Sequence, residues 1–318
     1  MTPSLVKAAV VQAGSVLFDT PRTLNKLAEL TAEAAGRGAQ IVVFPEAFVG
    51  GYPKGLDFGA RIGMRSPEGR EDFRRYYESA IEVGGAQSAQ IAATARDNGV
   101  YLVVGIIERD AGTLYCTALM FAPDGRLLGR HRKLMPTALE RLVWGCGDGS
   151  TLTVVDSTIG RIGSVICWEN YMPLLRMAMY AQGIELYCAP TVDDRDTWLP
   201  TMRTIAIEGR CFVLSACQFL RRSDAPAEYA AIQGDAPATV LIRGGSCMVD
   251  PLGNVLVEPV FGEETILMAE LDRRIIARGK FDLDVVGHYA RPDIFRLTVN
   301  RNVLESVVYS NPLNEAAT

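Results

Sequence analysis

The stretch Gly160-Arg-Ile-Gly-Ser-Val-Ile-Cys167-Trp-Glu-Asn170 is the centre around which the expected fold is arranged. An apolar segment leads directly into Cys167, and Met172-Pro173-Leu174-Leu175 then begins a helical pattern for which Asn170 is a plausible N-cap. A cysteine at a strand-to-helix turn lies at the edge of a sheet, beside backbone N–H groups that favour a thiolate and stabilise an oxyanion. The alternative is a structural cysteine buried in the core, which is the common environment of a free thiol.

Strand and helix patterns alternate on both sides of this turn. Strands are expected at 7–12, 41–44, 101–107, 184–189, 211–216 and 265–271, and helices at 20–36, 87–98, 174–182 and 198–209. Two hairpins are expected around Pro123-Asp-Gly125 and Asp250-Pro-Leu-Gly253. Residues 50–69 are expected to form a loop and residues 219–242 an irregular excursion. This order predicts a pair of mixed β-sheets with helices outside, in one domain.

The composition is that of an ordinary globular protein, with 318 residues, 48% hydrophobic and 22% charged. A net charge of −5 argues against a nucleic-acid partner, which requires a concentrated basic patch. No apolar run reaches the roughly 20 residues that span a bilayer, so no membrane association is expected. The first residues do not resemble a signal peptide, and a cytoplasmic location is the expectation.

The cysteine and histidine contents limit the possible chemistry. Seven cysteines without a CxxC pair make a disulfide framework improbable in a chain of this size. The two histidines, His131 and His288, have no partner at metal-ligand spacing, so no metal site is expected. If Cys167 is a nucleophile, its base is therefore expected to be a carboxylate, with His288 only a weak rival.

Glu46 is a carboxylate in apolar surroundings, directly after the strand pattern Ile41-Val-Val-Phe-Pro45. Burial raises the pKa of a carboxyl group, which suits a general base that works near neutral pH. The alternative is an ordinary charge at the end of a strand, since most perturbed carboxylates are structural.

Lys133 ends the second strand of the first hairpin, and Glu140 follows seven residues later. Pointing inward, the ammonium would stabilise a thiolate or a developing anion, and Glu140 could orient it. The alternative is that His131, Arg132 and Lys133 form a solvated basic edge that blunts strand pairing, with Glu140 an ordinary surface charge.

Several separated segments together resemble the nitrilase superfamily, and specifically the branch of true nitrilases. They run in order from Val6 to Phe295 and are Phe44-Pro-Glu46-Ala-Phe-Val-Gly-Gly-Tyr-Pro-Lys-Gly55, Arg132-Lys133-Leu-Met-Pro-Thr137 with Glu140-Arg-Leu-Val-Trp144-Gly-Cys-Gly-Asp-Gly149, Cys167-Trp-Glu-Asn170, Ala189-Pro-Thr-Val-Asp-Asp-Arg-Asp-Thr-Trp198, Glu208-Gly-Arg-Cys-Phe-Val-Leu-Ser-Ala-Cys-Gln218 and Gly287-His-Tyr-Ala-Arg-Pro-Asp293. Two departures are Cys146, where a longer polar residue is expected, and the short chain beyond Phe295.

The resemblance implies a fold and a set of site residues. The fold is a four-layer αββα sandwich with mixed sheets, here assigned to residues 1–296, with a tail at 297–318. The implied catalytic residues are Glu46, Lys133 and Cys167, with Glu140 as an additional acid. Tyr52, Trp168 and Thr191 are expected to bind substrate, although Tyr52 and Trp168 could equally be core packing. The resemblance also implies homodimers that build larger homo-oligomers or helical filaments.

The implied reaction is hydrolysis of an organic nitrile to the carboxylic acid and ammonia through a cysteine thioimidate and thioester, without metal or organic cofactor. An amidase or carbamoylase of the same superfamily is the first alternative, and a non-catalytic filament-forming scaffold is the second. Whether the nitrile is aromatic, arylacetonitrile-like, aliphatic or cyanide itself is left open.

Overall fold

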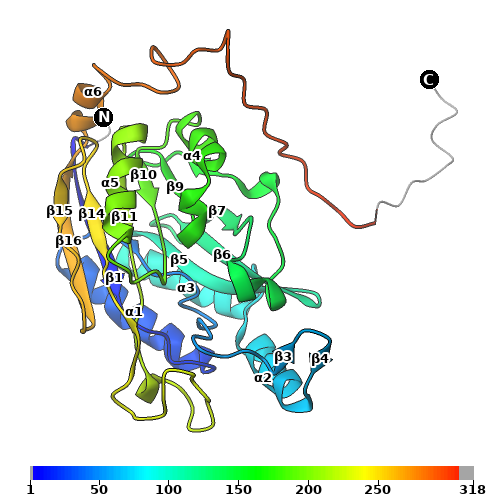
Figure 1. The fold of residues 1–318 in the computed structure, drawn as a ribbon. Coiled ribbons are helices and arrows are strands. Elements are labelled where there is room, and N and C mark those ends of the chain that lie inside the picture. The colour runs from blue at the N-terminus through cyan, green and yellow to red at the C-terminus, as the bar shows by residue number, and fades with distance from the viewer. Residues whose placement is uncertain (1–2, 308–318) are drawn as a thin grey trace, which may run out of the picture.

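The computed structural model describes residues 3–307 and contains two six-stranded sheets (Figure 1). In spatial order the first sheet consists of β16 (Thr265–Asp272), β1 (Leu5–Gln12), β2 (Ile41–Val43), β5 (Tyr101–Asp110), β6 (Thr113–Phe121) and β7 (Leu127–Arg132). The second consists of β15 (Val255–Val257), β14 (Cys247–Val249), β11 (Phe212–Ser215), β10 (Leu186–Cys188), β9 (Ile162–Ser164) and β8 (Val154–Val155).

Both sheets are mixed and share one pairing pattern. In the first sheet β1, β2 and β5 are parallel, and β16, β6 and β7 are added antiparallel. In the second sheet β9, β10 and β11 are parallel, and β8, β14 and β15 are added antiparallel. The carboxyl ends of three adjacent parallel strands therefore lie at one edge of each sheet, where ligand sites of α/β proteins are usually built.

Helices cover the outer face of each sheet. Helices α1 (Thr20–Gly36) and α3 (Ala86–Asn98) pack on the first sheet through a core that includes Leu27 and Ile91. Helices α4 (Pro173–Tyr180) and α5 (Trp198–Gly209) pack on the second sheet through a core that includes Met179 and Ile205. A third core joins the two sheets, and the predicted four-layer αββα sandwich is confirmed.

The central strands are apolar on both faces because both faces are covered. In β1, Ala8 and Val10 point into the core between the sheets, whereas Ala9 and Val11 belong to the core beneath the helices. The alternation follows from the two-residue period of a strand. A near-continuous apolar run is therefore the correct sequence signature here.

Two segments contain more structure than the sequence predicts. The expected loop at 50–69 contains β3 (Ala60–Arg61) and β4 (Met64–Arg65) and the start of α2 (Pro67–Ser79). The Ser66 hydroxyl accepts the Gly69 N–H at 3.0 Å and caps this helix, whose side chains are mostly polar. The excursion at 219–242 contains the antiparallel pair β12 (Phe219–Arg221) and β13 (Val240–Arg243), joined through a short 3-10 helix, η4 (Arg222–Asp224).

After α6 (Arg274–Gly279) the chain has no further helix or strand up to residue 307, and Figure 1 shows it leaving the body of the molecule. Arg301 donates to the Leu152 carbonyl at 3.3 Å, which holds one point of the segment against the second sheet. The boundary predicted at residue 296 stays a prediction, and residues 308–318 of the expected tail lie outside the described residues. Within residues 3–307, no helix is long and apolar enough to cross a membrane.

Candidate active site

The predicted catalytic residues lie just beyond the carboxyl ends of strands from both sheets. Glu46 follows β2 and Lys133 follows β7, both in the first sheet, whereas Cys167 follows β9 in the second. Thr191 follows β10, the parallel neighbour of β9. Residues far apart in the sequence therefore meet where the two sheets face each other.

Lys133 joins the two predicted acids. Its Nζ donates to Glu46 Oε1 at 2.7 Å and to Glu140 Oε2 at 2.7 Å. The Lys133 and Glu46 side chains are both fully buried, so the alternative of a solvated basic edge is wrong for Lys133. The Glu46 Oε2 atom is buried and has no hydrogen-bond partner among the described residues, which leaves it able to accept a proton.

Glu140 is held from several sides. It lies in a 3-10 helix, η1 (Ala138–Leu142), where its Oε2 also accepts the Thr137 N–H at 2.6 Å. The Tyr52 hydroxyl donates to the other oxygen, Oε1, at 2.8 Å. Tyr52 therefore reaches the Lys133 network through Glu140, in addition to lining the site.

Cys167 opens η3 (Cys167–Tyr171) in a left-handed conformation, with φ of 50°. This conformation is uncommon outside glycine and is typical of strained functional turns. Its N–H donates to the Pro190 carbonyl at 2.9 Å, and the Thr191 hydroxyl donates to its sulfur at 3.2 Å.

The sulfur faces a cavity of about 240 Å³. The cavity is lined by Tyr52, Lys54, Thr137, Glu140, Cys167, Trp168, Val192, Asp193, Asp194 and Arg195. Tyr52 and Trp168 thus lie beside the nucleophile, as the sequence predicts, and Thr191 touches the sulfur from behind this wall. Glu46 and Lys133 lie deeper, out of contact with bulk water.

Burial controls the protonation of the cysteine and its neighbouring acid. Burial, together with the negative charge of Glu46, raises the pKa of the Cys167 thiol far above its usual value, although Lys133 opposes the shift. Burial likewise raises the pKa of Glu46, against the opposing charge of Lys133. Backbone N–H groups at this turn favour a thiolate, but burial of the sulfur opposes its charge, so the thiol needs a base when it reacts, which is the role predicted for Glu46.

The expected helix cap at Asn170 is also wrong. The Asn170 side chain donates to the carbonyls of Val165 at 3.0 Å and Cys167 at 2.7 Å, which braces the nucleophile turn. Helix α4 is instead preceded by Met172, and Pro173 occupies its first turn as predicted. The Asn170 Oδ1 atom, which a cap would use to accept a helix N–H, is buried and has no hydrogen-bond partner among the described residues.

Three buried polar residues near the site were not predicted. Glu169 and His131 form a pair, with Nε2 3.0 Å from Oε2. The Gln218 amide donates to the Glu46 carbonyl at 2.7 Å and fixes the backbone of that residue. The strand-like environment of His131 could have indicated burial, whereas no local pattern marks Gln218. His288 is exposed and bonds to the Lys280 carbonyl, far along the chain from this network.

Among residues 3–307, no group of three or more histidine, cysteine, aspartate or glutamate side chains is arranged to hold a metal ion. The seven cysteines all have free thiols. The groups that meet at the site are the Cys167 thiol, the carboxyl groups of Glu46 and Glu140, and the Lys133 ammonium.

The chain is similar to known proteins over nearly its whole length. The carbon-nitrogen hydrolase family model matches residues 7–280. A nitrilase of Bradyrhizobium diazoefficiens is 59% identical over 94% of this chain and 93% of its own. An aliphatic nitrilase of Sinorhizobium fredii is 58% identical over 95% of this chain and 98% of its own. A bifunctional nitrilase/nitrile hydratase of Nicotiana tabacum is 53% identical over 99% and 91%.

Solved structures share the fold at lower identity. The NitFhit protein of C. elegans has a TM-score of 0.73 at 20% identity, over 96% of this chain and 70% of its own. An amidase of Nesterenkonia sp. has a TM-score of 0.64 at 20% identity, over 87% and 95%. With a family model that spans most of the residues and relatives above 50% identity across nearly all of them, the chain belongs to the nitrilase branch of the carbon-nitrogen hydrolase family.

Proposed function

We propose that the chain hydrolyses organic nitriles to the carboxylic acid and ammonia, with Cys167 as the nucleophile. The observation that carries the proposal is the Cys167 sulfur facing a cavity in front of the buried Glu46–Lys133–Glu140 network. The relatives named as nitrilases support the choice of a nitrile over an amide.

In the first half of the reaction, Glu46 takes the proton from Cys167 as the sulfur attacks the nitrile carbon, and the proton passes to the nitrile nitrogen. The product is a thioimidate. Negative charge that builds on the nitrogen is stabilised by the Lys133 ammonium and by the backbone N–H of Trp168. The N–H groups on either side, of Cys167 and Glu169, donate to the carbonyls of Pro190 and Ile166.

In the second half, Glu46 activates a water that adds to the thioimidate and gives a tetrahedral intermediate. The intermediate releases ammonia and leaves a thioester, and a second water then releases the carboxylic acid and restores the thiol. If the tetrahedral intermediate expels the sulfur instead, an amide is formed. The positions of protons on Glu46, Glu140 and Lys133 decide between these exits.

The organic group of the substrate is assigned to the space around Tyr52 and Trp168. A second cavity, of about 370 Å³, shares Tyr52 and Glu140 with the cysteine cavity and is lined largely by apolar side chains, including Leu56, Phe58, Leu139, Leu142, Val143, Trp144 and Ile232. An apolar wall beside a few polar groups is typical of a small-molecule site. Thr191 supports the sulfur, as its 3.2 Å contact indicates.

A substrate panel tests the proposal. Benzonitrile, phenylacetonitrile, propionitrile and cyanide are incubated with the protein beside the matched amides, and acid, amide and ammonia are quantified by mass spectrometry and a colorimetric assay. Cys167→Ala should abolish turnover, whereas Cys146→Ala, at an exposed cysteine of the loop after η1, should retain it. Hydrolysis of amides without any nitrile would replace the proposal by the amidase alternative.

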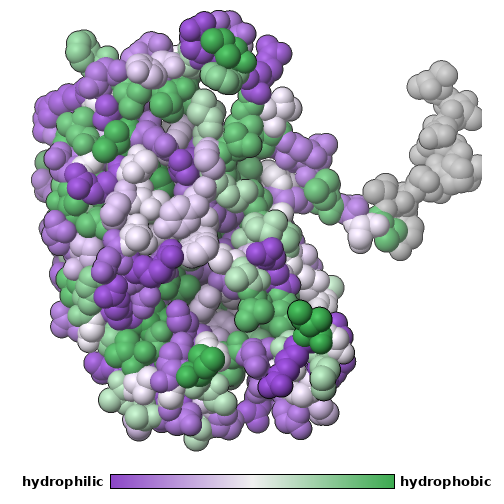
Figure 2. Space-filling model, in the orientation of Figure 1, coloured by the Kyte–Doolittle hydropathy of each residue, from purple (hydrophilic) through white to green (hydrophobic). Residues whose placement is uncertain are grey.

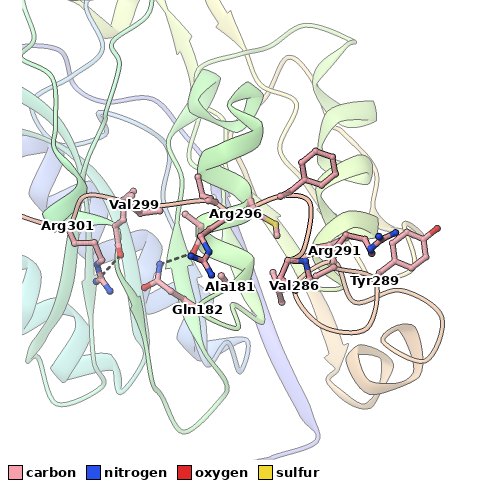
Figure 3. Close-up of a pocket in the computed structure, with 16 residues that line it drawn as sticks. Ala181, Gln182, Val286, Tyr289, Arg291, Arg296, Val299 and Arg301 are labelled. Carbon is pink, nitrogen blue, oxygen red and sulfur yellow. Dashed lines mark hydrogen bonds between the residues drawn. The ribbon is translucent and has the colours of Figure 1, made fainter.

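We further propose that the chain forms homodimers that build larger homo-oligomers. Exposed apolar side chains of the C-terminal segment 281–307 support this, and they are Phe281, Tyr289, Ile294, Phe295, Leu297, Val299, Val303, Leu304 and Val307. Figure 2 shows the segment projecting from the body with apolar and polar residues exposed. A largely apolar cavity of about 600 Å³ lies between it and α4, where Figure 3 shows Val299 and Arg296 near Gln182. Exposed apolar area of this extent favours a protein partner.

A further inference from the structure

Glu169 lies two residues after the nucleophile and is 1% exposed. Its carboxyl group meets three donors: the Leu134 N–H at 2.6 Å on Oε1, and the Ile166 N–H and His131 Nε2, each at 3.0 Å, on Oε2. Burying a carboxylate costs several kcal/mol unless donors of this kind compensate it. The site therefore carries a costly group that the reaction itself does not use.

The three donors come from both sides of the active site. His131 and Leu134 flank Lys133 at the end of β7, in the first sheet. Ile166 immediately precedes Cys167, after β9 of the second sheet. One carboxyl group thus ties the backbone that carries the amine to the backbone that carries the sulfur.

The protonation of the pair follows from its partners. His131 Nδ1 is 3.2 Å from the Thr151 carbonyl, which only accepts, so Nδ1 carries a proton. A single further proton then lies between Nε2 and Glu169 Oε2, and the pair is neutral overall. Burial opposes the charged ring, but the charge and hydrogen bond of Glu169 outweigh it and raise the pKa of His131. The contact is therefore a hydrogen bond in which the His131 ring and the Glu169 carboxyl group share one proton.

We propose that Glu169 and His131 act as a clamp that sets the separation of Lys133 from Cys167. Both are positioning residues, because neither lines the cavity that the sulfur faces and neither would touch substrate. A displacement of about 1 Å between reacting groups costs about 10²-fold in rate, so a clamp that spans the two sheets acts directly on turnover. The measurement of kcat rests on the proposed nitrile hydrolysis, whereas the measurement of Cys167 alkylation described below does not.

The test compares Glu169→Gln and His131→Asn with Asp250→Asn. Asp250 is a matched control: its buried carboxylate also accepts two backbone N–H groups, of Leu252 and Asn254, but in a hairpin at the other side of the second sheet. Glu169→Gln should lower kcat by about 10²-fold while KM changes by less than about threefold. Alkylation of Cys167 by iodoacetamide, followed by peptide mass spectrometry without any nitrile, should slow in parallel.

The pair should also behave as a unit. The double variant should lose no more activity than Glu169→Gln alone, because both substitutions remove the same interaction and their effects are therefore not additive. Asp250→Asn should lower Tm and leave both rates per folded molecule unchanged. If Glu169→Gln does not fold, His131→Asn gives the same readouts.

The proposal is overturned if the clamp variants keep the alkylation rate of the native protein, or if their loss only follows the unfolded fraction as it does in Asp250→Asn. Failure of the native protein to hydrolyse any nitrile would instead remove the proposed function. Slower alkylation in the clamp variants would still support the clamp in that case.

Discussion

At the scale of single residues, Cys167 and Glu46 depend on each other because burial suppresses the charge of both. The neutral thiol cannot attack until a base removes its proton, and the buried carboxyl group with a raised pKa is a base that can do so. Lys133 opposes both shifts, because its ammonium stabilises negative charge on either group.

The first prediction concerns the pH dependence of Glu140→Gln. The charge of Glu140 raises the pKa of Glu46, so its removal lowers that pKa. Because the proposed mechanism needs the Glu46 carboxylate, the acid limb of kcat/KM should move to lower pH, even though the maximal rate falls. Tyr52→Phe removes only the 2.8 Å hydrogen bond and keeps the charge, so it is the control. An acid limb that moves to higher pH in Glu140→Gln would contradict the assignment of Glu46.

The second prediction concerns the hydroxyl that donates to the sulfur. Thr191→Val keeps the shape of a fully buried side chain and removes the donor. A hydrogen bond to a charged group is worth about 1.5–3 kcal/mol, so kcat should fall about 10- to 100-fold with little change in KM. Steady-state kinetics with the best nitrile of the panel measure this. Thr191→Ser keeps the hydroxyl and should stay near the native rate; equal losses in both variants would point to packing instead.

At the scale of elements, β5 supports the loop that carries Glu46. A Cβ atom at Gly105 would lie 2.2 Å from the Pro45 carbonyl oxygen and 2.7 Å from the Ala47 N, so only glycine fits beneath this segment. The third prediction is that Gly105→Ala lowers Tm, at an overpacking cost of about 1–3 kcal/mol, and also lowers kcat because Glu46 is displaced.

The control for this change lies in the same hairpin. Gly112, between β5 and β6, has open space within 4 Å of where a Cβ atom would lie and has no positive φ, so Gly112→Ala should leave both values near native. Thermal unfolding and kinetics on the two variants decide the matter. If Gly105→Ala lowers Tm but keeps the native kcat, β5 stabilises the fold without positioning Glu46, and the prediction is wrong.

Helices and strands whose apolar residues recur with a clear period could be predicted from the sequence, whereas mostly polar elements could not. The helix expected at 198–209 matches α5, because its apolar face packs on a sheet. Helix α2 was missed because it buries few residues, among them Tyr76, although Ser66 and Pro67 mark its start. The approach of Lys133 to Glu46 followed from family resemblance and not from local pattern, since it depends on the packing of whole sheets. The raised pKa of the Cys167 thiol could not be predicted from the sequence, because burial is a tertiary property.

At the scale of the whole molecule, the exposed C-terminal segment predicts self-association. Phe295 is 77% exposed and borders the cavity next to α4. The fourth prediction is that Phe295→Glu lowers the sedimentation coefficient of the native assembly, because a charge replaces an apolar contact. Ile62→Glu, at an exposed turn between β3 and β4, is the control and should sediment like the native protein. Equal coefficients for all three proteins would remove the segment from the proposed interface.

Glu46 and Lys133 follow strands of one sheet, and Cys167 follows a strand of the other. The apolar core between the sheets therefore sets the distance between the sulfur and its two partners. Repacking this core for thermal stability would shift the two sheets relative to each other by fractions of an ångström while the protein stays folded. Substitutions that stabilise this core should then raise Tm and lower kcat together. Stabilising substitutions on the outer helices should raise Tm without this loss of activity.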